Sequence, residues 1–325
     1  TLHHEITTTS DLAQKFFDQG LRLVYAFNHE EAIAAFTEAS RLDPDAPMPY
    51  WGVALSLGPN INAAMDPKVE PRAVEAVQKA TARLSQATAR ERAYVEALAA
   101  RYSAKKSVTR KAKDEAYAKA MRQVAREAPD DADAATIAAE AMMVLRPWDY
   151  WRADGRPQPG TEEILAILEA ALRQHPDHPG ACHYYIHAVE ASPDPQRALD
   201  CAKRLPSLMP GAGHLVHMPA HIYMRLGRYR EASERNATAA MVDHEYLSRH
   251  PLEGNYASGY YAHNLHFLNA SLMMEGRSAE ALQVARDLLV KVPADEIAKE
   301  PSLEWYAPTV LLTMARFGQW GDLIR

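Results

Sequence analysis

The chain has little cysteine, no excess of positive charge and no long hydrophobic run. Its 325 residues include two cysteines, and 36 Lys and Arg residues are outnumbered by 42 Asp and Glu residues, for a formal net charge of −6. A nucleic-acid partner needs a basic surface, so the charge argues against one. No apolar run reaches the ~20 residues that cross a bilayer, so we expect no membrane span. Two isolated cysteines, here Cys182 and Cys201, are more often buried thiols than a disulfide.

The short motifs of several enzyme classes are also missing. The sequence contains no Gly-rich phosphate loop, no G-x-S-x-G elbow and no HExxH zinc-protease signature. It has no C-x-x-C-H attachment sequence, although bis-histidine haem ligation stays open. The first residue is Thr1 rather than methionine, which fits a processed N-terminus. The compartment stays open, and a periplasmic or secreted location after removal of an export signal is slightly favoured over a cytoplasmic one.

From Ala13 to Pro44 the residue spacing is that of a 34-residue helix-turn-helix repeat. Its marker positions hold Gly20, Leu23, Ala32, Phe36, Ala39 and Pro44. On these residues the sequence resembles the tetratricopeptide-repeat family. The resemblance implies an all-α superhelix (solenoid) of about seven helical hairpins with almost no strand. We expect one repeat domain over residues 13–325, after a polar, non-periodic arm over residues 1–12.

Apolar periodicity and proline punctuation extend the helical pattern along the chain. The helices predicted after the first hairpin are 45–57 with 71–84, 87–102 with 111–128, 131–145 with 162–174, 183–189 with 196–205, and a last helix over 303–317. Two insertions interrupt this pattern. The first, residues 146–160, is too rich in Pro, Gly and Trp to be helical, and the second falls within 243–258. Both are candidate lids over the inner wall.

Seven histidines occupy equivalent positions in the repeats between residues 180 and 290. Ala198, Ala232 and Ala281 mark similar helical phrases, and the residue fifteen places before each of them is a histidine. Counting back eleven or eighteen places reaches histidine in four of six cases, with Ala270 and Gly180 as the exceptions. Such offsets differ by three and four residues, so the imidazoles share one face of each helix. The seven are His183, His187, His214, His217, His221, His263 and His266.

This pattern predicts a metal centre. Neutral imidazole is the commonest metal ligand, and histidines at i and i+4 form a recognised chelating pair. An all-imidazole set suits copper, zinc, iron or nickel better than magnesium or calcium, and we expect copper first, then iron or zinc. The resemblance implies that this face lines the inner wall of the superhelix. Imidazoles lining a wet channel without a metal are the structural alternative.

Other residues near the histidines are candidates for supporting roles. Glu190 shares the inner face three residues after His187, and Tyr261 comes just before His263, so we consider both as catalytic groups. Glu140 is a weaker candidate on an earlier helix. Met224 and Met273 are expected to pack rather than bind copper. On the N-terminal arm, the candidates for extra ligands are His3 and His4, although a solvated arm is the expectation.

The leading hypothesis is a metal-dependent oxidoreductase that acts on a small molecule in the groove. A zinc-dependent hydrolase with Glu190 as base is the competing enzyme. The family resemblance implies a different class, a non-catalytic scaffold that binds a peptide or protein partner. A metal carrier or sensor with the same ligands is a further alternative.

Overall fold

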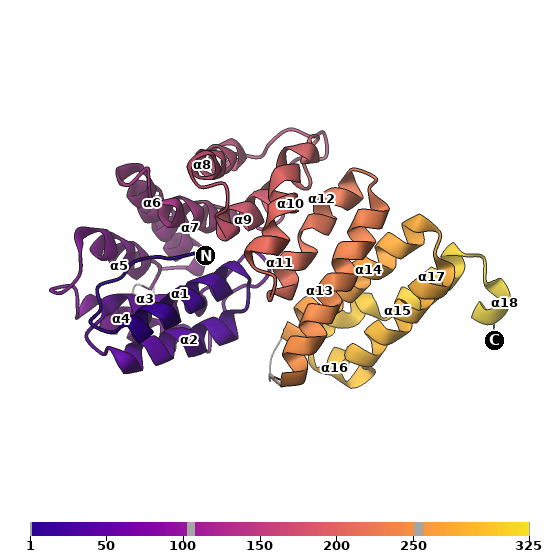
Figure 1. Cartoon of the computed structure of the whole chain (residues 1–325), viewed down its shortest axis with the longest axis horizontal. Helices are drawn as coiled ribbons and strands as arrows, with labels where there is room; N and C mark the ends of the chain where they lie inside the picture. The colour runs from indigo at the N-terminus through magenta and orange to yellow at the C-terminus, as the bar shows by residue number, and fades with distance from the viewer. Residues whose placement is uncertain (1, 103–107, 250–255, 325) are drawn as a thin grey trace. The chain divides into compact units, whose positions relative to one another are not determined.

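The computed structural model describes residues 2–102, 108–249 and 256–324. In these ranges all regular elements are helices, and strand pairing is limited to an isolated antiparallel bridge between Trp151 and Pro157. The predicted all-α fold of consecutive helical hairpins is confirmed (Figure 1). None of the helices in these ranges is both long and apolar enough to cross a lipid bilayer.

The chain forms two compact units, Thr1–Pro193 and Asp194–Arg325, and each is described by itself. The histidine-bearing repeats predicted over 180–290 begin in the first unit and continue in the second. The single repeat domain predicted over 13–325 stays a prediction.

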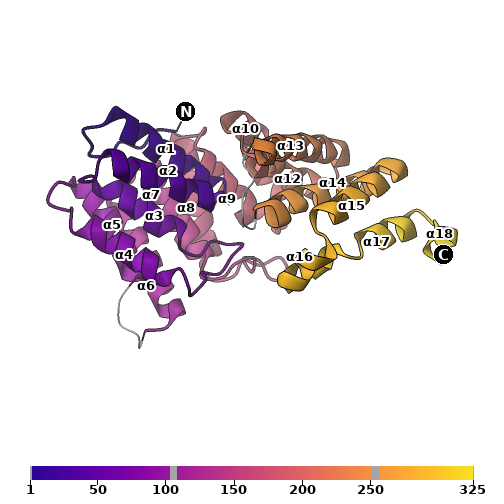
Figure 2. The ribbon, with the colours of Figure 1, turned by 90° about the horizontal axis from the view of Figure 1, so that it is seen from below.

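The first unit is a stack of antiparallel hairpins, in which α1 packs on α2, α3 on α4, α5 on α6, and α7 on α8 (Figure 2). Helices α7 and α1 both contact α9, so the last helix of the unit returns to the first. The helices are α1 (Asp11–Tyr25), α2 (His29–Leu42), α3 (Pro47–Ser56), α4 (Glu70–Thr81), α5 (Ala89–Arg101), α6 (Arg110–Glu127), α7 (Ala132–Met143), α8 (Thr161–Gln174) and α9 (Pro179–Val189).

The first hairpin shows why the repeat spacing folds as it does. Ser10 caps α1, because its side chain accepts a hydrogen bond from the backbone N–H of Ala13. A Cβ atom at Gly20 would lie 2.6 Å from the ring of Phe36, so only glycine lets the two helices approach this closely. The marker positions seen in the sequence are therefore the packing contacts of the hairpin.

The first predicted insertion is confirmed as non-helical. Residues 144–160 form turns and the Trp151–Pro157 bridge between α7 and α8. Gly155 and Gly160 have φ values of +81° and +93°, which residues with a Cβ atom rarely adopt. The second predicted insertion, 243–258, is partly helical, because α13 continues to Arg249 and a π-helix begins at Tyr256. Residues 250–255 lie outside the described ranges.

The second unit contains η1 (Pro195–Ala198), α10 (Leu199–Leu208), α11 (Gly213–His217), α12 (Pro219–Arg225), α13 (Tyr229–Arg249), the π-helix η2 (Tyr256–Tyr261), α14 (Ala262–Glu275), α15 (Ser278–Lys291), α16 (Ala294–Lys299), η3 (Pro301–Tyr306), α17 (Thr309–Arg316) and α18 (Trp320–Leu323). Helix α13 packs on α11, α12 and α14, and α14 packs on α15. The helix predicted over 303–317 is two elements, η3 and α17. Pro308, which has no N–H to continue a helix, stands at their junction.

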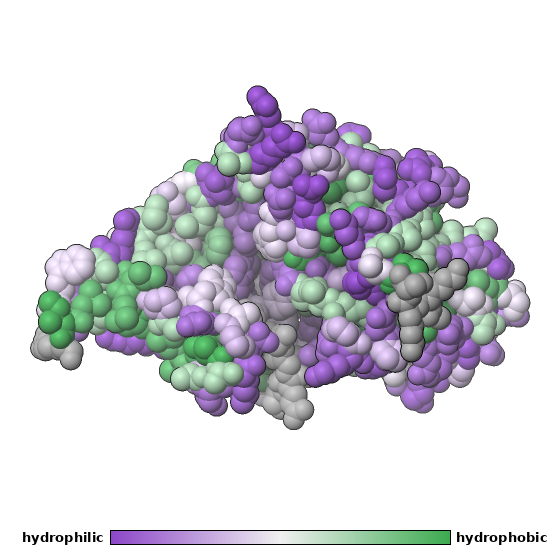
Figure 3. Space-filling model, turned by 180° about the vertical axis from the view of Figure 1, so that it is seen from behind, coloured by the Kyte–Doolittle hydropathy of each residue, from purple (hydrophilic) through white to green (hydrophobic). Residues whose placement is uncertain are grey.

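Helices α14 and α15 bury the apolar core of the second unit. Tyr261, Leu265 and Leu288 belong to a cluster of buried side chains completed by η3. Apolar side chains are also exposed on the last helices, where Leu311, Leu312 and Trp320 are more than half accessible. Figure 3 shows this hydrophobic surface near the C-terminus.

Candidate metal centre

Three of the seven predicted histidines meet in the second unit. His217 on α11 and His221 on α12 are 0% and 6% exposed, and His263 on α14 is half-buried. The Nε2 atoms of His217 and His221 are 2.8 Å apart, and the ring of His263 lies 4.8 Å from that of His217. One nitrogen from each ring lies within 4.8 Å of the others, a spacing within which these side chains could hold a metal ion.

A proline break sets the relative direction of the first two imidazoles. Met218 lies between α11 and α12. Pro219, the first residue of α12, has no N–H for a helical hydrogen bond. The N–H of His221 instead donates to the carbonyl of Met218 at 3.2 Å, a tighter turn than an α-helix makes. Thus the histidines at i and i+4 lie across a local kink.

A chain of hydrogen bonds fixes the proton on His217. The hydroxyl of Ser271 donates to the carbonyl of Phe267 at 2.8 Å, so its lone pairs accept from Nδ2 of Asn236 at 3.3 Å. Oδ1 of Asn236 then faces Nδ1 of His217 at 2.6 Å and can only accept. Nδ1 therefore carries the hydrogen in the neutral ring, and Nε2 offers its lone pair toward His221.

This arrangement matches what a metal ion requires of imidazole ligands. Two nitrogens that each lie about 2.0–2.1 Å from one ion are about 2.9 Å apart at a right angle and about 3.3 Å apart in a tetrahedron. The 2.8 Å between the two Nε2 atoms is close to the right-angle value. A ligating histidine typically donates its other N–H to an outer partner that orients the ring, and Asn236 occupies that position for His217. The ring of Phe267 lies 4.6–5.5 Å from all three imidazoles and shields one side of the cluster.

Two other predicted ligands of the second unit lie outside this group of three. The ring of His214 is 5.9 Å from that of His217 and 4.9 Å from that of Tyr260. His266 packs against Trp305 and Tyr306 at 4.9 and 5.4 Å, and burial lowers its pKa. The ligand roles of both residues stay predictions.

The remaining two predicted ligands, His183 and His187, form an i and i+4 pair on α9 in the first unit. Nδ1 of His183 donates to the carbonyl of Tyr25 at 2.7 Å, and Nδ1 of His187 lies 2.9 Å from Oε1 of Glu190. The basic nitrogen of each neutral ring is therefore Nε2, and the two ring centroids are 4.8 Å apart. The predicted partnership of Glu190 with this face is thus a direct contact with His187, whereas a catalytic role for Glu190 stays a prediction.

Backbone strain is concentrated beside this histidine pair. Among the described residues other than glycine, positive φ angles occur at Phe27, with φ 58°, and Trp148, with φ 63°. The ring of Phe27 lies 4.5 Å from that of His183, and the ring of Trp148 lies 5.0 Å from that of His187. Such strained positions cluster at functional sites because the surrounding packing must hold them. The buried α9 pair is thus flanked by two residues in strained backbone conformations.

The other two candidate side chains are both buried. Tyr261 is 6% exposed within the apolar cluster of α14 and α15, and burial raises its pKa; its catalytic role stays a prediction. Glu140 is 7% exposed and lines a cavity of about 20 Å³ together with Tyr25, His29 and Tyr184. Burial raises the pKa of Glu140 to about 7, although the charge of Arg101 acts in the opposite direction.

Several residues that hold the histidines lie outside the repeat pattern of the sequence. Asn236 was not singled out, although an asparagine inside a helix, four residues after the marker Ala232, is a signal that a buried polar partner is needed. His178 lies outside the equivalent repeat positions, and its Nε2 lies 3.0 Å from Oδ1 of Asp133 in the interior of the first unit. The expectation of a solvated N-terminal arm is wrong at His4, which is 4% exposed and lies 2.7 Å from Oδ2 of Asp133.

The hairpin geometry and the close approach of Gly20 to Phe36 decide the architecture. The chain has a tetratricopeptide-like fold. Among solved structures it is similar to yeast Tom70, at 14% identity and a TM-score of 0.42 over 97% of this chain and 67% of that one. It is also similar to a thermophilic TPR protein of Thermus thermophilus, at 13% identity and a TM-score of 0.28 over 92% of this chain and 99% of that one. At these scores neither similarity bears on function. No family model and no curated protein matches the sequence.

Proposed function

We propose that the protein is a metal-dependent oxidoreductase on a helical-repeat scaffold, with its metal ion held by His217, His221 and His263. The observation that carries the proposal is the 2.8 Å approach of two buried Nε2 atoms, one of which Asn236 leaves without a proton. Buried polar groups are placed this close when they share a hydrogen or a cation, and a third imidazole stands within reach of both.

The ligand set favours copper, with iron or zinc as alternatives. All three groups are imidazoles, which suit copper, iron and zinc and are poor ligands for magnesium or calcium. A bound copper(II) or iron(III) ion would accept one electron at a time from the small-molecule substrate proposed for it, and dioxygen is the proposed co-substrate that would reoxidise the ion. The chain would hold the ion through its imidazoles. Asn236 orients the ring of His217, and Phe267 shields one side of the cluster.

A zinc hydrolase is the weaker alternative for the second unit. A hydrolytic site needs a general base beside the metal-bound water. The group of three within 4.8 Å contains histidines and no carboxylate among the described residues of this unit. Binding of a peptide or protein partner by the scaffold stays a prediction, as does a periplasmic or secreted location.

Metal analysis tests the proposal. Protein purified without chelators or metal resin is expected to carry copper or iron, and His217→Ala with His221→Ala is expected to lose the equivalent held by the second unit. Helicity by circular dichroism is expected to stay near that of the wild type, since the helices are held by apolar packing. Copper(II) bound to the wild type is expected to show nitrogen hyperfine structure by electron paramagnetic resonance. Unchanged metal content in the double variant would overturn the assignment of these ligands, and redox chemistry would be overturned if the ion that the double variant loses were zinc.

A further inference from the structure

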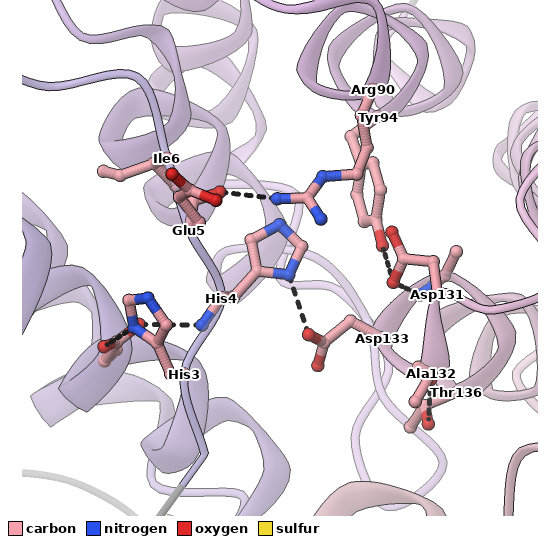
Figure 4. A network of polar contacts seen from close by, with 12 residues as sticks. His3, His4, Glu5, Ile6, Arg90, Tyr94, Asp131, Ala132, Asp133 and Thr136 are labelled. Carbon is pink, nitrogen blue, oxygen red and sulfur yellow. Dashed lines mark hydrogen bonds and ion pairs between the residues drawn. The ribbon is translucent and has the colours of Figure 1, made fainter. Parts of the chain in front are cut away.

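The N-terminal arm is fastened to the first unit by carboxylates on three helices. Nδ1 of His3 lies 2.7 Å from Asp18 on α1, and Thr7 donates from its N–H and its hydroxyl to Glu91 on α5, both at 2.6 Å. Between these contacts His4 reaches the start of α7, 129 residues further along the chain. Figure 4 shows its ring lying beside Asp131 and Asp133.

In each of the two aspartates at the start of α7, the Oδ1 atom has two hydrogen-bond partners in the surrounding structure. Oδ1 of Asp131 caps the helix at the N–H of Ala134 and accepts from the hydroxyl of Tyr94, at 2.9 and 3.0 Å. Oδ1 of Asp133 accepts from the hydroxyl of Tyr25 at 2.6 Å and faces Nε2 of His178 at 3.0 Å. The Oδ2 atom of Asp133 is left for His4, whereas the Oδ2 atom of Asp131 is buried and has no hydrogen-bond donor.

His4 carries a second buried atom without a partner. Its Nδ1 lies 2.7 Å from Oδ2 of Asp133, and a carboxylate can only accept, so Nδ1 carries the hydrogen of the neutral ring. Nε2 is then a bare lone pair, and it is buried in a side chain that is 3% exposed, with no hydrogen-bond partner. Two buried acceptors, Nε2 of His4 and Oδ2 of Asp131, thus lack any donor, which is costly unless something else satisfies them.

We propose that Nε2 of His4 and Oδ2 of Asp131 form a binding site for a divalent metal ion of the zinc type. One nitrogen of His4 and one oxygen from each aspartate lie within 4.8 Å of one another. Nε2 of His4 and Oδ2 of Asp131 are the protein ligands, and water completes the coordination. Asp133 holds the other side of the imidazole, the carboxylate–histidine–metal arrangement that orients ligating histidines elsewhere. An imidazole with a carboxylate suits zinc and similar ions better than calcium or magnesium.

Occupancy of this site ties the N-terminal arm to α7. The ion joins His4 of the arm to the residue that caps the helix, so metal binding and docking of the arm stabilise each other. Arg90 on α5 opposes the ion, because its guanidinium donates to the carbonyl of Glu5 at 2.7 Å and brings positive charge to the same surface. Removing this charge with Arg90→Gln is expected to leave zinc binding intact or to strengthen it.

Anomalous diffraction at the zinc edge, from crystals grown with zinc, tests the proposal by position. A peak is expected between Nε2 of His4 and Oδ2 of Asp131 in the wild type and in Arg90→Gln. Asp131→Asn keeps the helix cap, since asparagine caps as well as aspartate, and its amide can donate to His4 in place of the ion. The peak is therefore expected to vanish in Asp131→Asn without loss of folding.

Equilibrium dialysis with zinc gives a second measurement in solution. His4→Ala and Asp131→Asn are each expected to bind one zinc fewer per chain than the wild type. An ordered water with no anomalous signal at saturating zinc, a peak that persists in Asp131→Asn, or an unchanged zinc count would overturn the site. Because peaks at the histidines of the second unit fall at other positions, this site and the proposed redox centre succeed or fail separately.

Discussion

Nδ1 of His217 lies 2.6 Å from Oδ1 of Asn236, and this contact decides which nitrogen of the imidazole is available to a ligand. Ser271 extends the contact to the backbone, because its hydroxyl hydrogen is taken by the carbonyl of Phe267. The orientation of the asparagine amide is therefore anchored at both ends. A ring held in this way loses little freedom when it binds an ion.

We predict that Asn236→Ala lowers the metal affinity of the second unit about 10–100-fold, the usual effect of losing a partner behind a ligand. Copper affinity is measured by competition with a chelator of known strength. Asn269→Ala is the matched control, because Asn269 is equally buried on α14 but bonds to the carbonyl of Ala281 and to Thr313. Equal losses in the two variants would mean that Asn236 acts only through general stability.

His263 and His266 lie on the same helix in different surroundings, so substitutions can test their ligand roles one at a time. His263 and His266 lie three residues apart on α14, but only His263 belongs to the group of three. We predict that His263→Ala weakens metal binding at least tenfold, whereas His266→Ala leaves it unchanged and lowers the melting temperature by removing contacts with Trp305 and Tyr306. The same competition assay measures the metal affinity of both variants, and thermal denaturation measures their melting temperatures. A loss of affinity in His266→Ala would restore the larger ligand set that the sequence pattern indicates.

The fold was predictable because its signals are local. The marker positions Gly20 and Phe36 lie within one short repeat, and the structure packs them against each other. The break between η3 and α17 was missed, although Pro308 stands at the junction. A continuous apolar period across residues 303–317 outweighed one residue that could not continue a helix.

The candidate site was predictable only in its residue types. Equal repeat offsets placed seven histidines on one face, but offsets along a helix do not show how neighbouring helices are turned. His263 and His266 share a face at three residues' spacing, and yet one meets His217 while the other meets Trp305. The partner of His4 could not be found from spacing, since Asp133 lies 129 residues away and the arm has no periodic pattern.

The stability of the first unit should depend on pH through Glu140. Burial raises the pKa of this carboxyl from 4.5 to about 7, so the folded chain holds a proton that the unfolded chain releases between these values. That contribution to stability is fully present below pH 4.5 and is lost as the pH rises through 7. The change is on the order of 3 kcal/mol for a shift of this size. Chemical denaturation at pH 5 and pH 8 is expected to show a smaller difference for Glu140→Gln than for the wild type, and equal differences would contradict the prediction.

Gly213, at the start of α11, is predicted to tolerate no side chain. A Cβ atom built there would lie 1.9 Å from Oδ1 of Asp243, a buried carboxyl that also accepts from Tyr256 and Asn264. Since α11 also carries His217, Gly213→Ala is expected to displace α11 from α13, cost about 1–3 kcal/mol or more of stability, and weaken metal binding. Gly211→Ala is the control two residues away, because nothing lies within 4 Å of a Cβ atom at that position. Denaturation curves and copper affinities of the two variants check this prediction, and a Gly213→Ala protein that matched Gly211→Ala in both would show that α11 is not held against α13 by this contact.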